Sequence, residues 1–467
     1  MINFSIPAAT VVGLPDPERA MLAELQQVFW RHQAANDIKN RYYEGKISLD
    51  SVNLGIALPE GLRKLEIGCA WGAKCVDVLA ARSMFDGFVG ADGDGVDELN
   101  ELVRRNNLID QYNKAVRDEL KIGATFATLS ADPALGCKIR FHSAETAAAL
   151  WDGDKGRIRC GMAIIDTAPD NNDTSVWRPS VVYLYTAAAI WVLTRRGTAW
   201  VAAPQAHRMG RPLMEPLVWN ATSDKPFGRS RIKEPVRRLI DGYVRTLANA
   251  SIGLEFATSP QKYLLGVTDE QYEAVTSARF RQYVGSLIAA TQNPETGQNP
   301  VFGQLMQGSI QPHVDMLRLL ATQFSAATGL TVTDTGVVND ANPTSSDAIL
   351  AQSQTLVAMA EQLNVGNGDA LRSIAQMALA IIRNTAPEEL TDKEKAVVAH
   401  FRNPAMPSIS VTADAAAKIA AVRPSFADTD VYLEMMGFSQ ADIRRIKAEE
   451  QVFFAQVREY KKSETSE

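Results

Sequence analysis

The chain has 467 residues, 46% of them hydrophobic, which is enough for about two to four folded domains and excludes a disordered protein. Its 54 acidic and 48 basic residues give a net charge of −6, which argues against a tight or sequence-reading nucleic-acid binder with a basic face. Four scattered cysteines, Cys69, Cys75, Cys137 and Cys160, exclude a disulfide framework and favour reduced thiols. The N-terminus lacks the pattern of a signal peptide, and no run of about 18 apolar residues occurs, so we expect neither secretion nor a membrane span.

The N-terminal half predicts one helix followed by an α+β region. Residues 15–45 start with acidic side chains and favour a helix whose buried positions are Leu22, Leu25, Val28 and Phe29. Residues 97–119 predict one long polar helix. The β-rich runs between 61 and 220 are residues 88–90, 123–129, 157–166, 180–193 and 198–203.

Two amphipathic helices and a compact insert follow. Residues 231–250 carry an apolar stripe at helical spacing, and the insert after them reads as a small α/β module with a Tyr- and Arg-bearing helix around 270–285. Gly329 ends the second helix. The stripe of that helix is Ile310, Val314, Leu317, Leu320, Ala321 and Phe324.

A polar loop, residues 331–346, joins this helix to the next. Its Thr, Asp, Asn and Gly residues favour turns, and Asn342-Pro343 fixes an extended step. Ser345 or Ser346 can cap the following helix, whose apolar seam is Ile349, Leu356, Met359 and Leu363. Taken alone, the segment is an ordinary helical hairpin. Another apolar-striped helix is expected at 370–383, and the tail 413–460 reads as three helical pieces.

One motif points to a different class of protein. Residues 65–72, Leu-Glu-Ile-Gly-Cys-Ala-Trp-Gly, resemble the first glycine loop of class I methyltransferases, and Asp92 falls about where those enzymes place an acidic residue for the cofactor ribose. However, Ala70-Trp71 replaces the Gly-x of such loops, and no alternating strand–helix series follows. Buried structural roles for Leu65 and Trp71 are therefore favoured, with an adenosylmethionine-dependent methyltransferase as the alternative.

Other constellations of catalytic or metal-binding residues are weak. The five histidines include no pair at metal-ligand spacing, and there is no nucleophile elbow or phosphate-binding P-loop. The acidic run 92–98 departs from the EF-hand pattern and favours a solvated turn. We therefore expect no catalytic residues, no metal and no cofactor, and a protein that is not an enzyme.

Four short segments in a fixed order resemble one family. They are Tyr42-Tyr43-Glu44-Gly45, Gly228-Arg229-Ser230-Arg231-Ile232, Ala326-Ala327-Thr328-Gly329-Leu330 and Asn342-Pro343-Thr344-Ser345-Ser346-Asp347-Ala348-Ile349. Together they resemble the portal proteins of tailed bacteriophages, in particular the siphophage-type portal family, from about residue 15 to 450. None of these motifs performs chemistry, and the resemblance rests on their order and spacing.

The resemblance implies an α+β, multidomain, helix-rich portal fold that assembles into a ring with a central channel. The division that it implies is wing 1–228, stem helix 229–253, clip 254–307, stem helix 308–329, tunnel loop 330–346, long wing helix 347–384, wing return 385–412 and crown 413–467.

The resemblance also implies a conduit for DNA. A homo-oligomeric ring, of 12 subunits in this family, would occupy one capsid vertex of the virion after assembly in the host cytoplasm. Genomic double-stranded DNA would pass through it during packaging and ejection without being read. The implied partners are major capsid and scaffolding proteins, terminase and the head–tail connector or adaptor, with no membrane.

Candidate contact residues follow from the same resemblance. Because residues 331–346 contain no Lys or Arg, the loop is expected to guide DNA past rather than hold it. The tunnel-loop candidates are Thr333, Asp334, Gly336, Val337, Val338, Asn339, Asp340 and Asn342. The clip candidates are Tyr263, Tyr272, Arg279, Arg281 and Tyr283. The stem candidates, for which a solvated face is the simpler interpretation, are Lys233, Arg237, Arg238, Arg245 and Arg318.

Overall fold

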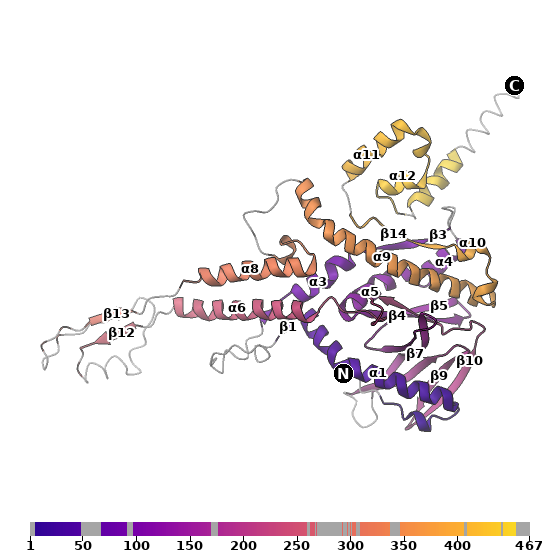
Figure 1. Cartoon of the computed structure of the whole chain (residues 1–467), viewed down its shortest axis with the longest axis horizontal. Coiled ribbons are helices and arrows are strands. Elements are labelled where there is room, and N and C mark those ends of the chain that lie inside the picture. The colour runs from indigo at the N-terminus through magenta and orange to yellow at the C-terminus, as the bar shows by residue number, and fades with distance from the viewer. Residues whose placement is uncertain are drawn as a thin grey trace.

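A computed structural model shows a layered body from which a pair of helices projects to one side (Figure 1). The chain is described at residues 5–47, 67–90, 97–169, 176–258, 262–266, 268, 292, 297, 299, 301–304, 309–336, 346–405, 409–439 and 442–453. The mixture of helices and antiparallel sheets confirms the predicted α+β class. Within these ranges, no helix is long and apolar enough to cross a bilayer. All four cysteines are buried and free.

The outer layer of the body is a five-stranded antiparallel sheet that is covered on both faces. On one face, Leu22, Leu25 and Phe29 of α1 (Asp16–Tyr43) pack against the strands, as their helical spacing predicts. On the other face, alternate residues such as Tyr185 and Ile190 join the main core. The strand order is β10 (Ala199–Ala206), β9 (Ala189–Arg196), β8 (Trp177–Tyr185), β7 (Arg157–Pro169) and β6 (Ala147–Asp152).

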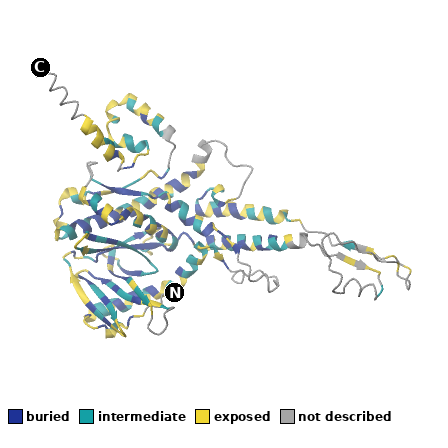
Figure 2. Ribbon diagram, turned by 180° about the vertical axis from the view of Figure 1, so that it is seen from behind, coloured by how far each residue is buried: buried dark blue, intermediate teal, exposed yellow. Residues whose placement is uncertain are grey.

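A three-stranded antiparallel sheet lies between this layer and the helices. Helices α5 (Leu108–Ile122) and α9 (Ser346–Arg383) pack on it. Residues 373–382 of α9 include no exposed position, and Leu371, Ile374 and Ala378 are fully buried, so this part of α9 lies in the core of the body (Figure 2). The strand order is β11 (Met214–Val218), β4 (Ala124–Asp132) and β5 (Gly136–Ser143).

Short elements complete the body. Strand β14 (Val398–Phe401) returns from the C-terminal part of the chain to pair antiparallel with β3 (Phe85–Val89). The two-residue strands β1 (Lys46–Ile47) and β2 (Ile67–Gly68) also pair. The remaining short helices of the body are α3 (Trp71–Ala80), α4 (Asp97–Arg105), η1 (Ala8–Thr10), η4 (Pro387–Glu389) and α10 (Asp392–Lys395).

The C-terminal helices form a separate layer beyond β14 (Figure 1). They are α11 (Ile409–Val422), η5 (Pro424–Phe426), α12 (Asp430–Met435) and a helical stretch at 442–453. On the other side of the body, the paired helices α6 (Glu234–Thr258) and α8 (Gln311–Thr328) lead to the antiparallel strands β12 (Lys262–Leu265) and β13 (Val301–Gln304). The short helix η3 (Thr333–Thr335) follows α8.

Three predictions about elements of the body were wrong. The separate helix expected at 370–383 is the C-terminal part of α9, which is unbroken from Ser346 to Arg383. The other two elements are interrupted by contacts between a side chain and the backbone. Residues 97–119 form two helices because Asn107 adopts a left-handed conformation (φ 49°) and the Asn106 side chain bonds the backbone of β5 at Cys137 and Ile139. The apolar run 180–193 is divided between β8 and β9, with a turn in which the Thr186 hydroxyl bonds the backbone of Ala189. In both cases, hydrogen bonds between a side chain and the backbone of another residue stabilise the interruption of the predicted element.

Candidate functional site: the root of the paired helices

Helices α6 and α8 run in opposite directions side by side and are covered only where they join the body (Figure 1). Leu320, Ala321 and Phe324 in the inner half of α8 are buried, whereas Met316 and Leu319 are 43% and 51% exposed. On α6, by contrast, Val244, Ala248 and Ala250 remain buried further out along the helix. The chemistry of the site therefore lies at the inner end, which we call the root cluster: Trp71, Arg231, Tyr243, Phe324 and Thr328.

Arg231 joins three segments at the root. Its side chain is only 6% exposed. Nε donates to the backbone O of Cys75 at 2.6 Å, Nη2 donates to the backbone O of Thr328 at 2.6 Å, and the guanidinium lies 5.7 Å from the ring of Trp219. Since carbonyl oxygens at the ends of helices otherwise lack donors, this one side chain ties the end of α8 to α3 and to the start of α6.

Arg231 precedes α6 and is not part of it. The predicted helix start at 231 was wrong: the backbone N of Arg231 donates to the O of Leu120, and the Ser230 hydroxyl accepts from the N of Ile232 at 2.9 Å. These bonds hold the segment in a turn, and α6 begins at Glu234, with Pro235 in its first turn. The helix then continues beyond Ala250 to Thr258.

Trp71 holds the other side of the root. Its ring lies 4.2 Å from that of Tyr243 on α6 and 4.7 Å from that of Phe324 on α8. Its indole N–H donates to the backbone O of Thr335 at 3.1 Å. Trp71 therefore packs between both projecting helices and holds the first turn of the loop that follows α8, which confirms the prediction that it is a buried structural residue.

The Tyr-Tyr pair at the end of α1 clamps the root from outside. The Tyr42 hydroxyl donates to Asp241 on α6 at 2.7 Å, and the Tyr43 hydroxyl donates to Asp77 on α3 at 2.9 Å. Gly72 permits this contact, since a Cβ at that position would collide with the backbone O of Tyr42. This motif contributes mechanical bracing and performs no chemistry.

The described part of the loop after α8 turns back onto the body. Thr333 and Gly336 are exposed, whereas Asp334 accepts from the N and the hydroxyl of Thr331 at 3.0 and 2.8 Å. The carboxylate of Asp334 is thus occupied within its own turn. The remaining tunnel-loop candidates, Val337, Val338, Asn339, Asp340 and Asn342, lie outside the described residues.

The basic residues expected on the paired helices do not form one uniform band. Lys233, Arg238, Arg245 and Arg318 are exposed, and Arg238 is paired with Glu234 at 2.6 Å. Arg237 is partly buried, with its guanidinium 5.9 Å from the ring of Tyr42. Of the clip candidates, Tyr263 is 43% exposed on β12. Tyr272, Arg279, Arg281 and Tyr283 fall in the part of the chain that the structure leaves undescribed.

A buried polar network connects α5 to α9, the helix that follows the loop. Asn367 Nδ2 donates to Glu119 Oε2 at 2.9 Å and to the Tyr112 hydroxyl at 3.0 Å, and that hydroxyl also bonds Ser83 Oγ at 2.8 Å. Burial raises the pKa of the Glu119 carboxyl to about 8, so the group is mostly protonated at neutral pH. Among the described residues, Glu119 Oε1 and Asn367 Oδ1 have no hydrogen-bond partner. Protonation removes the charge that would otherwise be buried on Glu119 without a cation beside it.

The methyltransferase alternative finds no support in the fold. Strand β2 pairs antiparallel with β1, and β3 pairs antiparallel with β14, so the described strands near residues 65–90 do not form a doubly wound parallel sheet. Leu65 and Asp92 lie outside the described residues. Residues 68–72 serve as the entry to α3, where Gly72 allows close packing against α1. In the described ranges, no group of three His, Cys, Asp or Glu residues could hold a metal ion.

Comparison with known proteins adds to this geometry. No family model matches the chain. The chain is 23% identical to the portal protein of Mycobacterium phage L5 over 421 residues, which cover 88% of this chain and 84% of that protein. It is also 23% identical to the portal protein of Mycobacterium phage D29 over 394 residues, or 81% and 77% of the two chains. The chain is a relative of these portal proteins.

This relationship to portal proteins confirms the resemblance predicted from the sequence, and it extends over most of both chains. Among solved structures, the chain is similar to a chain from the neck of an empty gene transfer agent particle, with a TM-score of 0.45 and 12% identity over 80% of this chain and 89% of that one. A chain from the virion of a native gene transfer agent particle gives a TM-score of 0.43 at 12% identity, over 76% and 86%.

Sequence reasoning missed the central residue of the site. Arg231 was part of the Gly-Arg-Ser-Arg-Ile motif but was not expected to have a role of its own. Helical spacing gave no signal, because the residues three, four and seven positions after Arg231 are Glu234, Pro235 and Arg238, which are exposed, and α6 begins only at Glu234. An arginine in that position needs several acceptors, and here they come from distant backbone carbonyls.

Proposed function

We propose that the chain is the subunit of a phage portal ring at one capsid vertex, through which genomic DNA is packaged and ejected. The observation that carries this proposal is the antiparallel helix pair anchored in the root cluster, in a chain related along most of its length to the L5 and D29 portal proteins. In this assignment, α6 and α8 are the stem, 254–307 the clip, 330–346 the tunnel loop, α9 the long wing helix and 413–467 the crown. Residues 1–228 and 385–412 form the wing.

The proposed ring works as a conduit and not as an enzyme. The 25 residues of α6 span about 38 Å, enough to form a wall segment. Arg231 and Trp71 fix this wall and the first turn of the loop to the same body, so force on the loop passes directly into the core. With no Lys or Arg at 331–346, the loop guides the DNA backbone sterically and reads no bases.

The proposed partners follow from the same assignment. Neighbouring copies, 12 in the expected ring, would cover the apolar Met316 and Leu319 side chains that α8 leaves exposed. Capsid and scaffolding proteins would contact the body, and terminase and the head–tail connector would contact the clip. The ring would reside in the virion.

Negative-stain electron microscopy of the purified protein, alone and co-expressed with its capsid proteins, tests the proposal. Rings with a central hole are expected in at least one of these samples. Deletion of residues 333–342 should then preserve the rings but reduce retention of DNA in particles. Particles without a hole in both samples would refute the proposal, and so would unchanged DNA retention in the deletion variant.

A further inference from the structure

A groove of about 970 Å³ lies beside the root, between α1, β6 and residues 225–237. Its wall is held by Phe227, whose ring packs 5.7 Å from the rings of both Phe126 and Trp151. The groove is hollow because its floor is built of the shortest side chains. These floor residues are Ala124, Ala144, Ala147, Ala148 and Ala149.

The rim of this groove, called the basic groove from here on, is positively charged in a chain whose net charge is −6. Glu234 is the one carboxylate among the described residues that line it, and its Oε1 accepts from Arg238, which is not a lining residue. The cationic side chains on the rim come from two separate elements. Helix α1 contributes Lys39, with His32 beside it, and the segment that leads into α6 and its first turn contributes Lys225, Arg229, Lys233 and Arg237.

Among the described residues, two of these cations form no ion pair within 4 Å, although Glu145 acts on Lys39 and Glu234 interacts with Arg237 at longer range. Lys39 Nζ donates to the backbone O of Ile122 at 2.9 Å and to Asn36 Oδ1 at 3.1 Å, both neutral acceptors. Arg237 lies against Tyr42, and its buried Nε has no hydrogen-bond partner among the described residues. Burial, followed by the nearby charge of Arg237, lowers the pKa of Lys39 to about 8, while Glu145 acts in the opposite direction.

We propose that the basic groove binds an acidic peptide segment of a partner protein, with an apolar side chain on the alanine floor and carboxylates at Lys39 and Arg237. A carboxylate there would complete the hydrogen bonding of Arg237 and favour the charged form of Lys39. A nucleic-acid backbone would satisfy the cations but would place nothing apolar on the alanine floor, so a peptide fits the chemistry better. The site is independent of whether the chain forms a ring.

The test uses a fluorescein-labelled peptide of alternating leucine and glutamate, a matched peptide with glutamine for glutamate, and a labelled DNA duplex, each titrated with the full chain. Arg237→Gln should weaken binding of the acidic peptide about tenfold, the loss expected for one charge-assisted pair. Arg238→Gln, the adjacent arginine outside the groove, should change it by less than about twofold. Ala35→Trp, at an exposed lining position, should also weaken binding by filling the groove.

Each other outcome overturns the proposal. If Arg237→Gln and Arg238→Gln weakened binding of the acidic peptide equally, the binding would reflect non-specific attraction between the peptide and the charged surface. Tight binding of the duplex with no binding of the acidic peptide would make the groove a nucleic-acid site. If no peptide bound and Ala35→Trp changed the subunit association measured by light scattering, the occupant would be a second copy of this chain. Urea unfolding curves of each variant that match the wild-type curve establish that the fold is intact.

Discussion

Glu119→Gln should remove a pH dependence of stability that the buried network imposes on the body. Burial raises the pKa of Glu119 from 4.5 to about 8. The folded protein therefore binds this proton more tightly than the unfolded chain, and the stability contributed by the group is fully present below pH 4.5 and lost as pH rises to about 8. At about 1.36 kcal/mol per pKa unit, the loss across this window amounts to about 5 kcal/mol.

Glutamine reproduces the protonated carboxyl in shape and hydrogen bonding. Its amide oxygen can accept from Asn367 Nδ2 as Glu119 Oε2 does, and its uncharged amide places no charge in the core at any pH. We therefore expect the variant to be within about 1 kcal/mol of wild type near pH 5. Near pH 8 we expect it to be more stable by several kcal/mol.

Urea unfolding at matched protein concentration, followed by circular dichroism across this pH range, measures the difference. Glu101→Gln on the surface of α4 is the matched control. Hydrogen bonds from Arg105 and Arg104 lower the pKa of Glu101, so its contribution to stability is lost as pH falls, which is the opposite direction. A difference between Glu119→Gln and wild type that does not change with pH would refute the assignment of a neutral, buried Glu119.

Three further substitutions test the root cluster. Arg231→Met should cost about 3–5 kcal/mol because the carbonyl of Thr328 loses its charged donor, and thermal unfolding of the variant would measure this; a loss below about 1 kcal/mol would contradict the anchoring role. Trp71→Ala should lower the free energy of unfolding by about 3–5 kcal/mol and raise the hydrogen-exchange rates of the inner turns of α6 and α8. Unchanged exchange rates would show that Trp71 does not hold these two helices. Gly329→Ala should lower the free energy of unfolding measured in urea by more than about 1 kcal/mol, since φ is 72° and the new Cβ would lie 2.8 Å from Met359 Cε. Adding Met359→Ala should recover the part of this loss that the clash causes. No recovery would assign the whole loss to the backbone conformation.

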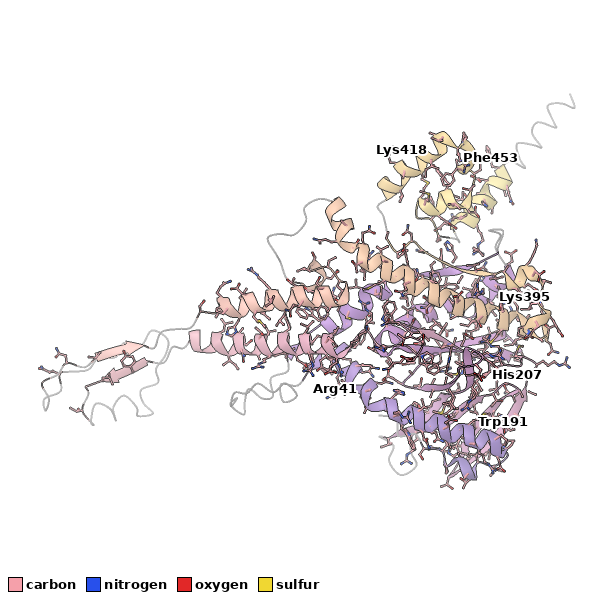
Figure 3. The ribbon with its side chains drawn as sticks, in the orientation of Figure 1. Arg41, Trp191, His207, Lys395, Lys418 and Phe453 are labelled. Atoms are coloured by element: carbon pink, nitrogen blue, oxygen red, sulfur yellow. The ribbon has the colours of Figure 1, made fainter. Side chains whose placement is uncertain are left out.

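Several side chains labelled in Figure 3 lie at the periphery of the molecule, away from the root cluster. In Figure 3, Lys395 and Lys418 mark the outer helices, Trp191 marks β9 of the five-stranded sheet, and His207 follows the edge strand β10. Phe453, in the last described helical stretch, is 61% exposed. Variants at Lys395, Lys418 and Phe453 serve as distant controls for the root and for the basic groove, because additivity is expected between separated sites.

The amino-acid sequence by itself determined the elements whose signals are local. The three-and-four spacing of Leu320, Ala321 and Phe324 predicted the inner face of α8, and Gly329 marked its end with a left-handed residue. The start of α9 and the buried face of α1 were also predicted correctly from the residues, whereas the full length of α9 followed only from the family resemblance, since periodicity had placed a separate helix at 370–383. The order of the short motifs was sufficient to indicate the family.

Only the tertiary structure decided which residues join these elements. Arg231 became central because carbonyls at Cys75 and Thr328, far apart in the chain, converge on it, and no local pattern encodes such a convergence. The same holds for Glu119, which lies in a stretch that looks polar but faces Asn367 of α9, and for β14, which pairs with β3 across some 300 residues. Local propensity selects helices and strands, whereas the partners of a buried charge or a strand edge are set by long-range packing.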